Sequence, residues 1–235
     1  MINSHLNIAE HCESFTRDKS VQILDFLDER ESINLYDWLN GDMPEDWWYT
    51  SIVGAQGVRP KKVEKIQIKP DTKKLRDTKI KEATETFLNG GWSFVFDRTM
   101  YHDTKCGCIE CQFFEFLRSQ DMLEFVKSIT DVDVQKLRWA FSSRYLPNFF
   151  LGPHTDVNNG KIGFVYSLSK NWRPGWGGNL HFMDKDYRTV TRTVVPVFNK
   201  LTLFDIPAKA GIPHYVSHVV PNVKAKRLSI AGWFG

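Results

Sequence analysis

A histidine and an aspartate two residues apart, His154 and Asp156, are the residues of this chain best suited to bind a metal together. On an extended strand, residues i and i+2 point to the same side, so both side chains can reach one ion. A second imidazole, from His214 or His218, would complete a set of two nitrogens and one carboxylate. Such a set binds Fe(II) and leaves coordination positions open for a chelating co-substrate and O₂. Arg227, in an otherwise apolar segment, adds a charged two-pronged donor for a carboxylate.

Seven separated segments between residues 144 and 234 together resemble a known family. They are Arg144-Tyr145-Leu146-Pro147, His154-Thr155-Asp156, residues 165–172, Gly177-Gly178-Asn179-Leu180, residues 199–204, residues 214–223 and residues 226–234. An isolated His-x-Asp carries little information, but all seven in this order and spacing resemble the Fe(II)/2-oxoglutarate-dependent dioxygenases. Within that family they are similar to the prolyl-hydroxylase-like branch.

The resemblance implies Fe(II), 2-oxoglutarate and O₂ as cofactors, with ascorbate as an optional reductant. It implies hydroxylation of an unactivated C–H bond, with release of succinate and CO₂. Asp156 occupies the position that halogenating relatives leave empty for chloride, so hydroxylation is the expected outcome. The substrate implied by the branch is a prolyl residue in a protein, or free proline or a related amino acid. The partners expected are therefore 2-oxoglutarate and a protein or amino-acid substrate.

The distal histidine has two candidates that fit the family's local pattern His-x-Val-x-x-Val equally well. Spacing favours His218, because it precedes Arg227 by nine residues, close to the interval in the prolyl-hydroxylase-like branch. His214 precedes Arg227 by thirteen residues and would need a lengthened hairpin. The expected metal ligands are therefore His154, Asp156 and His218, with His214 as the alternative distal ligand.

The resemblance also implies a co-substrate pocket. Arg227 is expected to hold the far carboxylate of 2-oxoglutarate, since a buried arginine requires an anionic partner. Tyr145, nine residues before His154, is similar in position to a tyrosine that relatives use near the co-substrate, although a packing role is also open. Ser167 stands where relatives can have a second tyrosine, which changes the expected hydrogen bonding of the carboxylate.

Two further functions are weighed against the hydroxylase. A non-catalytic jelly roll could keep the metal or 2-oxoglutarate site for stability or sensing, but the intact His154, Asp156 and Arg227 speak against degeneration. Nucleic acid demethylation is less favoured, because the alkylated-base-repair branch has another arginine six residues after the first, where this chain has Trp233. A nucleic acid partner is therefore not expected.

A second group of metal-binding residues has the pattern His-x3-Cys-x-Cys-x2-Cys, formed by His102, Cys106, Cys108 and Cys111. Three thiolates and one imidazole would make a closed, structural zinc site. The spacing is tighter than in common zinc knuckles, so reduced cysteines in a loop are the preferred interpretation.

Composition and charge agree with an ordinary globular protein. The chain has 235 residues, 42% of them hydrophobic, which is enough for a sizeable core in one domain. It has neither a run of 18 apolar residues nor an apolar signal peptide, so a soluble, cytoplasmic protein without a membrane partner is expected. Ten basic and three acidic residues between positions 59 and 81 make one basic segment, interpreted as a solvated surface.

The pattern of apolar residues predicts an α+β protein that is mainly β. We expect strands over residues 21–27 and 92–98, and helices over residues 28–40, 72–88 and 113–129. From residue 137 onward, short β-rich runs alternate with Gly, Pro and Asn turns, which favours two packed antiparallel sheets. The predicted fold is a double-stranded β-helix, or jelly roll, over residues 137–235. Residues 1–136 form a helical and strand elaboration that braces it, within one oxygenase domain.

Overall fold

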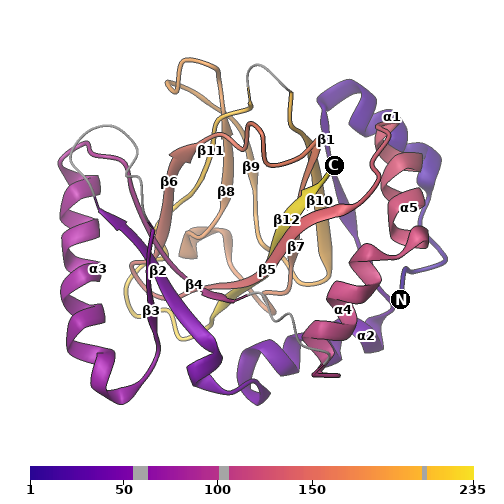
Figure 1. Ribbon diagram of the computed structural model, residues 1–235. Helices are drawn as coiled ribbons and strands as arrows, with labels where there is room; N and C mark the ends of the chain where they lie inside the picture. Colours follow the sequence, from indigo (N-terminus) through magenta and orange to yellow (C-terminus); the bar gives the residue numbers. More distant parts are fainter. Residues whose placement is uncertain (55–62, 101–105, 208–210) are drawn as a thin grey trace.

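The computed structural model describes residues 1–54, 63–100, 106–207 and 211–235. In this part of the chain, twelve strands form one antiparallel sheet that curls back on itself (Figure 1). Its main path runs in the order β1 (Ser20–Leu24), β10 (Lys200–Asp205), β7 (Ile162–Ser167), β12 (Arg227–Phe234), β5 (Leu137–Tyr145), β4 (Ser93–Thr99), β6 (Phe150–His154), β11 (His214–Val216), β8 (Leu180–Met183) and β9 (Val190–Val194). β2 (Trp48–Gly54) pairs with both β4 and β3 (Glu64–Gln67).

The curl brings two halves of the sheet face to face. The β6, β11 and β8 strands lie across an interior cavity from β12, β5 and β7, since residues of all six strands line it. This arrangement confirms the predicted jelly roll. The predicted strands over residues 21–27 and 92–98 correspond to β1 and β4.

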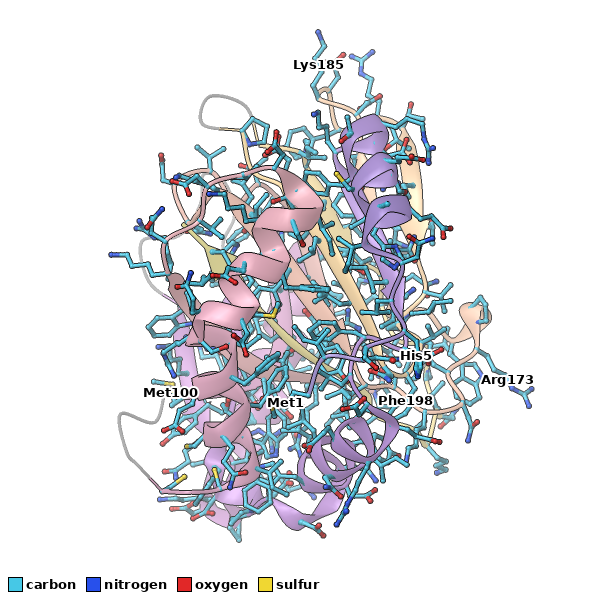
Figure 2. The ribbon with its side chains drawn as sticks, turned by 90° about the vertical axis from the view of Figure 1, so that its right-hand side faces the viewer. Met1, His5, Met100, Arg173, Lys185 and Phe198 are labelled. Carbon is cyan, nitrogen blue, oxygen red and sulfur yellow. The ribbon has the colours of Figure 1, made fainter. Side chains whose placement is uncertain are left out.

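Helices cover the outer face of the larger half. They are α1 (Ile8–Asp18), α2 (Glu29–Asp37), α4 (Ile109–Arg118) and α5 (Gln120–Thr130), while α3 (Lys73–Leu88) packs against β2 and β4. Figure 2 shows helices in front of the sheet, with side chains between the two layers. Four short helical turns complete the description: the π-helical η1 (Trp38–Asp42) and the 3₁₀ turns η2 (Glu45–Trp47), η3 (Pro70–Thr72) and η4 (Pro174–Trp176).

Strand alternation separates a helix-facing core from the cavity. On β10, Leu201 and Leu203 are fully buried in the core that contains Phe113 and Leu117 of α4, whereas Phe204 lines the cavity. Successive residues of a strand point to opposite faces, so one strand supplies both surfaces. The helices therefore hold the strands in place from behind without entering the site. None of the helices in the described ranges is long and apolar enough to span a bilayer.

Three features differ from the sequence-based prediction. The expected helix over residues 113–129 is two helices, α4 and α5, that meet at Ser119, whose hydroxyl accepts a hydrogen bond from the backbone N–H of Met122. Such an N-cap contributes about 1 kcal/mol and competes with continuation of the preceding helix. Helix α1 was not expected, because its stretch is mainly polar. Leu88, an apolar residue that would be expected to pack against the core at the end of the predicted helix over residues 72–88, is 73% exposed at the end of α3.

Candidate metal and co-substrate site

Three potential ligands converge at one end of the cavity: His154, Asp156 and His214. Nε2 of His154 lies 3.7 Å from Oδ1 of Asp156, and Nε2 of His214 lies 3.3 Å from Oδ2. One donor atom from each residue lies within 4.8 Å of the others. The convergence follows from strand register, because β6 and β11 are antiparallel neighbours in which His154 and His214 are paired.

Backbone carbonyls orient both imidazoles. Nδ1 of His154 lies 3.1 Å from the carbonyl oxygen of Gly152, and Nδ1 of His214 lies 2.9 Å from that of Ile212. A neutral ring that donates from Nδ1 keeps the lone pair of Nε2 for a metal. Both rings therefore present Nε2 toward the carboxylate between them.

The carboxylate of Asp156 is held in its ionised form. Burial raises its pKa, but the hydrogen bond that a protonated His214 donates and the charges that His214 and His154 carry when protonated outweigh burial, so the net pKa lies well below its usual range. The side-chain amide of Asn159 also donates to Oδ1 over 3.3 Å. Asp156 is consequently a charged acceptor inside a largely apolar cavity.

The structure brings His214, and not the predicted His218, beside His154 and Asp156. His218 follows the end of β11, and its ring stacks on Phe150 with 4.1 Å between ring centroids and also contacts Phe87. Its Nε2 is buried and makes no hydrogen bond with the described residues. The spacing argument assumed a shorter hairpin than the ten-residue segment 217–226 that joins β11 to β12, in which the Val219 N–H donates to the Phe149 carbonyl.

The cavity has a volume of about 360 Å³ and mostly apolar and aromatic walls. Its lining includes Trp92, Phe94, Phe96, Phe141, Leu151, Phe164, Leu180, Phe204 and Trp233, together with the three converging residues. A few polar groups break this surface, among them Ser143, Ser229, Arg98 and Arg227. Such a cavity suits a small ligand that is oriented by a few polar contacts.

Arg227 is the buried cation of this cavity, with 3% of its surface exposed. Its Nε donates to the Gly178 carbonyl over 3.0 Å, and Nη1 donates to Oγ of Ser229 over 2.7 Å. In the described part of the chain, no carboxylate forms an ion pair with Arg227. Burial lowers the pKa of its guanidinium, and this effect outweighs the opposite effect of Tyr145. The guanidinium carbon lies 4.5 Å from the ring centroid of Tyr145, which pairs with Arg227 in register.

The structure also places the two other residues predicted for the co-substrate pocket, Tyr145 and Ser167. Tyr145 is buried, and this burial raises the pKa of its hydroxyl to about 12. Ser167 is also buried and is paired with Ser229, but it is not part of the cavity wall. Lys200, paired with Ser167, is a second buried cation, and burial together with the charge of Arg227 lowers its pKa to about 8.

Several cavity residues were missed by sequence reasoning. Ser143 and Ser229 share a hydrogen bond of 2.9 Å beside Arg227. The period-two spacing of Ser143 with Tyr145, and of Ser229 with Arg227, was the signal that could have revealed them. Arg98 carried no such signal, because only the fold brings β4 to the cavity.

Arg98 lies between the first cavity and a second one of about 320 Å³, and it lines both. Its Nε is buried and has no hydrogen-bond partner among the described residues, and its guanidinium carbon lies 5.4 Å from the ring centroid of Phe141. Burial lowers its pKa, and no carboxylate within the described ranges forms an ion pair with it. The second cavity is lined by Arg98, Arg138, Trp139, Asn158, Asn159 and Trp233.

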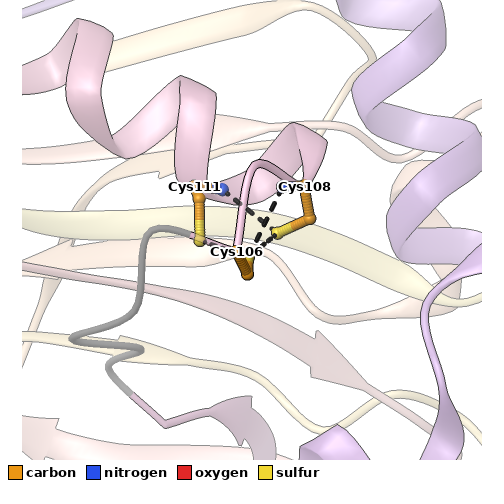
Figure 3. A group of neighbouring side chains, drawn as sticks. All are labelled: Cys106, Cys108 and Cys111. Atoms are coloured by element: carbon orange, nitrogen blue, oxygen red, sulfur yellow. Dashed lines mark hydrogen bonds between the residues drawn. The ribbon is translucent and has the colours of Figure 1, made fainter.

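The three cysteines of the second predicted metal group lie close together at the start of α4, outside this cavity (Figure 3). His102, the fourth member of the predicted group, is outside the described residues.

Comparisons with known proteins agree with this geometry. The model of the 2OG-Fe(II) oxygenase superfamily matches residues 140–235. None of the curated proteins matches the chain in sequence. A Pseudomonas putida prolyl-4-hydroxylase has the same fold over 97% of this chain and 98% of its own, with a TM-score of 0.59 and 16% identity.

Two further solved structures are similar. An oxidoreductase of the 2OG-Fe(II) oxygenase family from Burkholderia pseudomallei matches 100% of this chain and 92% of its own, with a TM-score of 0.60 and 14% identity. A Trichoplax adhaerens prolyl hydroxylase, in complex with a hypoxia inducible factor oxygen degradation domain peptide fragment, matches 97% and 88%, with a TM-score of 0.60 and 15% identity. At these identities the likeness shows the shared fold. Residues 140–235, which contain the three converging residues and Arg227, are the part of this chain that matches the 2OG-Fe(II) oxygenase superfamily.

Proposed function

We propose that this protein is a Fe(II)- and 2-oxoglutarate-dependent dioxygenase whose iron is bound by His154, Asp156 and His214. The observation that carries the proposal is that two oriented imidazoles and one ionised carboxylate converge in a cavity that also contains the buried Arg227. This donor set fits Fe(II) and leaves positions for other ligands. The carboxylate makes the site a full triad, which supports hydroxylation over halogenation.

Arg227 is proposed to bind the far carboxylate of 2-oxoglutarate. Because the hydrogen-bond partners of this buried guanidinium among the described residues, Gly178 and Ser229, are neutral, a bidentate anion would stabilise it strongly. The guanidinium of Arg227 lies over the face of the Tyr145 ring, and the charge of Lys200 adds positive potential nearby. Ser167 is proposed to support this group through its pairing with Ser229, without lining the cavity.

When iron and 2-oxoglutarate are bound, they supply oxidative decarboxylation to succinate and CO₂, coupled to hydroxylation of a C–H bond. The chain's own contribution is to position both ligands and keep water out. Aromatic residues such as Phe204 and Trp233 form the apolar wall around the metal-binding residues. Ascorbate as an optional reductant remains a prediction.

We propose a prolyl residue in a protein, or a free amino acid such as proline, as the substrate. Support comes from the fold shared with two prolyl hydroxylases, one of them in complex with a peptide. An apolar, aromatic cavity also suits a small hydrocarbon ring better than a nucleic acid base bearing several polar groups. The single oxygenase domain over residues 1–235, with its boundary at residue 137, and the cytoplasmic location remain predictions.

A turnover assay tests this function directly. Protein supplied with Fe(II), 2-oxoglutarate and O₂ is expected to form succinate faster when proline-containing peptides or free amino acids are added. Mass spectrometry of the stimulating compound should show the addition of one oxygen atom. A protein that binds iron and 2-oxoglutarate but forms no succinate with any candidate would instead be a non-catalytic binding module.

A further inference from the structure

The cysteines at the start of α4 form a cluster that the proposed reaction does not use. Sγ of Cys106 lies 2.9 Å from Sγ of Cys108 and 2.9 Å from Sγ of Cys111. Figure 3 shows the three sulfur atoms directed toward one another from the loop and the first turn of the helix. Cys106 is exposed and Cys111 is buried, so the cluster is reachable from the surface on one side.

The backbone is arranged around the sulfur atoms. The N–H of Cys108 points to Sγ of Cys106 at 3.4 Å, and the N–H of Cys111 points to Sγ of Cys108 at 3.5 Å. Gly107 has a φ of +68°, a left-handed conformation that lets the chain turn tightly between two cysteines. Cys108 is also the N-cap of α4, where backbone N–H groups and the helix dipole favour a thiolate.

From this geometry we propose that Cys106, Cys108 and Cys111 form a binding site for a thiophilic metal ion, with Zn²⁺ as the expected occupant. Zinc takes thiolates at about 2.3 Å in a tetrahedral arrangement, which places neighbouring sulfur atoms about 3.8 Å apart. A small outward movement of the three side chains from their present spacing reaches that arrangement. The three thiolates account for three of the four tetrahedral positions.

The position of the cluster indicates a structural role behind the cavity wall. Glu110, between Cys108 and Cys111, accepts hydrogen bonds from Thr99 of β4 over 2.8 Å and from Ser142 of β5. Their strand neighbours Arg98 and Ser143 point to the opposite face and line the cavity. A metal at the cluster would thus fasten the start of α4 to the two strands that carry the cavity wall.

Metal content and a cobalt spectrum test this site. Full-length protein purified without added metal is expected to contain about one zinc per chain, and Co²⁺ exchange should produce the intense near-ultraviolet thiolate charge-transfer absorption. Cys108→Ser should lose both signals. Cys12→Ser is the matched control, because Cys12 lies on α1, away from the cluster, and should change neither.

The histidine site can also bind Co²⁺, but its nitrogen and oxygen ligands give no thiolate absorption, so an Asp156→Ala variant should keep that band. Protein without zinc or a thiolate band, whose cysteines all react with an alkylating reagent, would overturn the proposal. A mass two daltons lower, indicating a disulfide, would overturn it as well.

A different observation, the uncompensated Arg98, leads to a second inference, which rests on the proposed function. We infer that Arg98 binds a carboxylate of the substrate. This half-buried cation lines both cavities and has an aromatic ring, but no described acidic side chain, as its partner. Arg138 lines the second cavity together with Arg98. Burial lowers the pKa of Lys65, and the charge of Arg98 lowers it further.

A neutral substrate would leave this charge uncompensated when it excludes water from the cavity. An anionic group would satisfy it through charge-assisted hydrogen bonds. The carboxylate can come from a free amino acid or from an acidic side chain near the target residue of a peptide. Both sources present the same chemistry to Arg98.

Matched substrates separate these sources and test the inference. The wild-type protein should prefer an acidic peptide over its amide counterpart, or a free amino acid over its amide. Arg98→Gln should raise KM at least tenfold for the charged member only, and Arg98→Lys should restore part of the preference. The KM for 2-oxoglutarate should not change, and Lys185→Gln, an exposed lysine between β8 and β9, is the control.

An equal change for charged and neutral substrates would overturn the role of Arg98. If no compound supports turnover, the same pairs can be compared by the spectral change that they cause in the iron and 2-oxoglutarate complex. Absence of preference there would overturn this inference, whereas preference without turnover would count against the proposed catalysis alone.

Discussion

His214→Ala is expected to abolish the visible charge-transfer band that Fe(II) and 2-oxoglutarate form together under anaerobic conditions, and with it all turnover. The imidazole of His214 supplies one of three ligands, and its Nε2 lies 3.3 Å from Asp156. Two remaining ligands cannot hold the ion in a defined geometry. The measurement is a titration of both ligands into the apoprotein, followed by absorbance.

His218→Phe is the matched control for this prediction. A phenyl ring can keep the stacking on Phe150 and Phe87, and it removes a buried ring nitrogen that makes no hydrogen bond. The band should therefore persist in this variant. Loss of the band in His218→Phe with retention in His214→Ala would contradict the assignment of the distal ligand.

Arg227→Ala is expected to weaken 2-oxoglutarate binding by about 30- to 700-fold, because a buried bidentate charged contact contributes roughly 2–4 kcal/mol. The affinity for Fe(II) alone should stay within a few-fold of the wild type, since the metal ligands lie on β6, β11 and the residues that follow β6. Both affinities can be measured by anaerobic titration. Arg227→Lys should recover part of the loss, because lysine keeps the charge but not the fork.

Equal weakening of iron and 2-oxoglutarate binding in Arg227→Ala would show a structural role instead. Such a role would rest on the hydrogen bonds that Arg227 donates to the Gly178 carbonyl and to Ser229, because the variant loses both. A circular dichroism spectrum and a thermal melt of the variant distinguish a local loss of the carboxylate partner from a collapsed cavity.

The two predictions examine different parts of one site. The histidine pair tests which strand residue completes the metal ligands, and the arginine tests where the co-substrate lies relative to them. If both hold, the cavity between β6 and β12 contains a complete oxygenase site, and Arg98 is the other arginine of its lining and available for substrate recognition. If only the first holds, a metal site without a defined co-substrate pocket remains.

Much of the fold could be predicted from local patterns. Gly, Pro and Asn turns between β-rich runs indicated the jelly roll after residue 137, and the helix predicted over residues 72–88 corresponds to α3. The break at Ser119 escaped, because the apolar stripes of α4 and α5 follow each other with nearly the same period. Helix α1 escaped because its largely polar stretch buries little beyond Phe15.

The sequence by itself determined the chemical types at the site: a His-x-Asp pair, a distal histidine among two candidates, and an arginine in an apolar strand. Only the tertiary structure decided which histidine lies beside His154 and Asp156, because that depends on the register of β11 against β6 and on the ten-residue segment that follows β11. The number of residues between two motifs shows neither the register of the strands nor the path of the segment that joins them. The same reason applies to Arg98, and to the convergence of Cys106 with Cys111, since long-range strand pairing and loop packing place side chains that local patterns treat as independent.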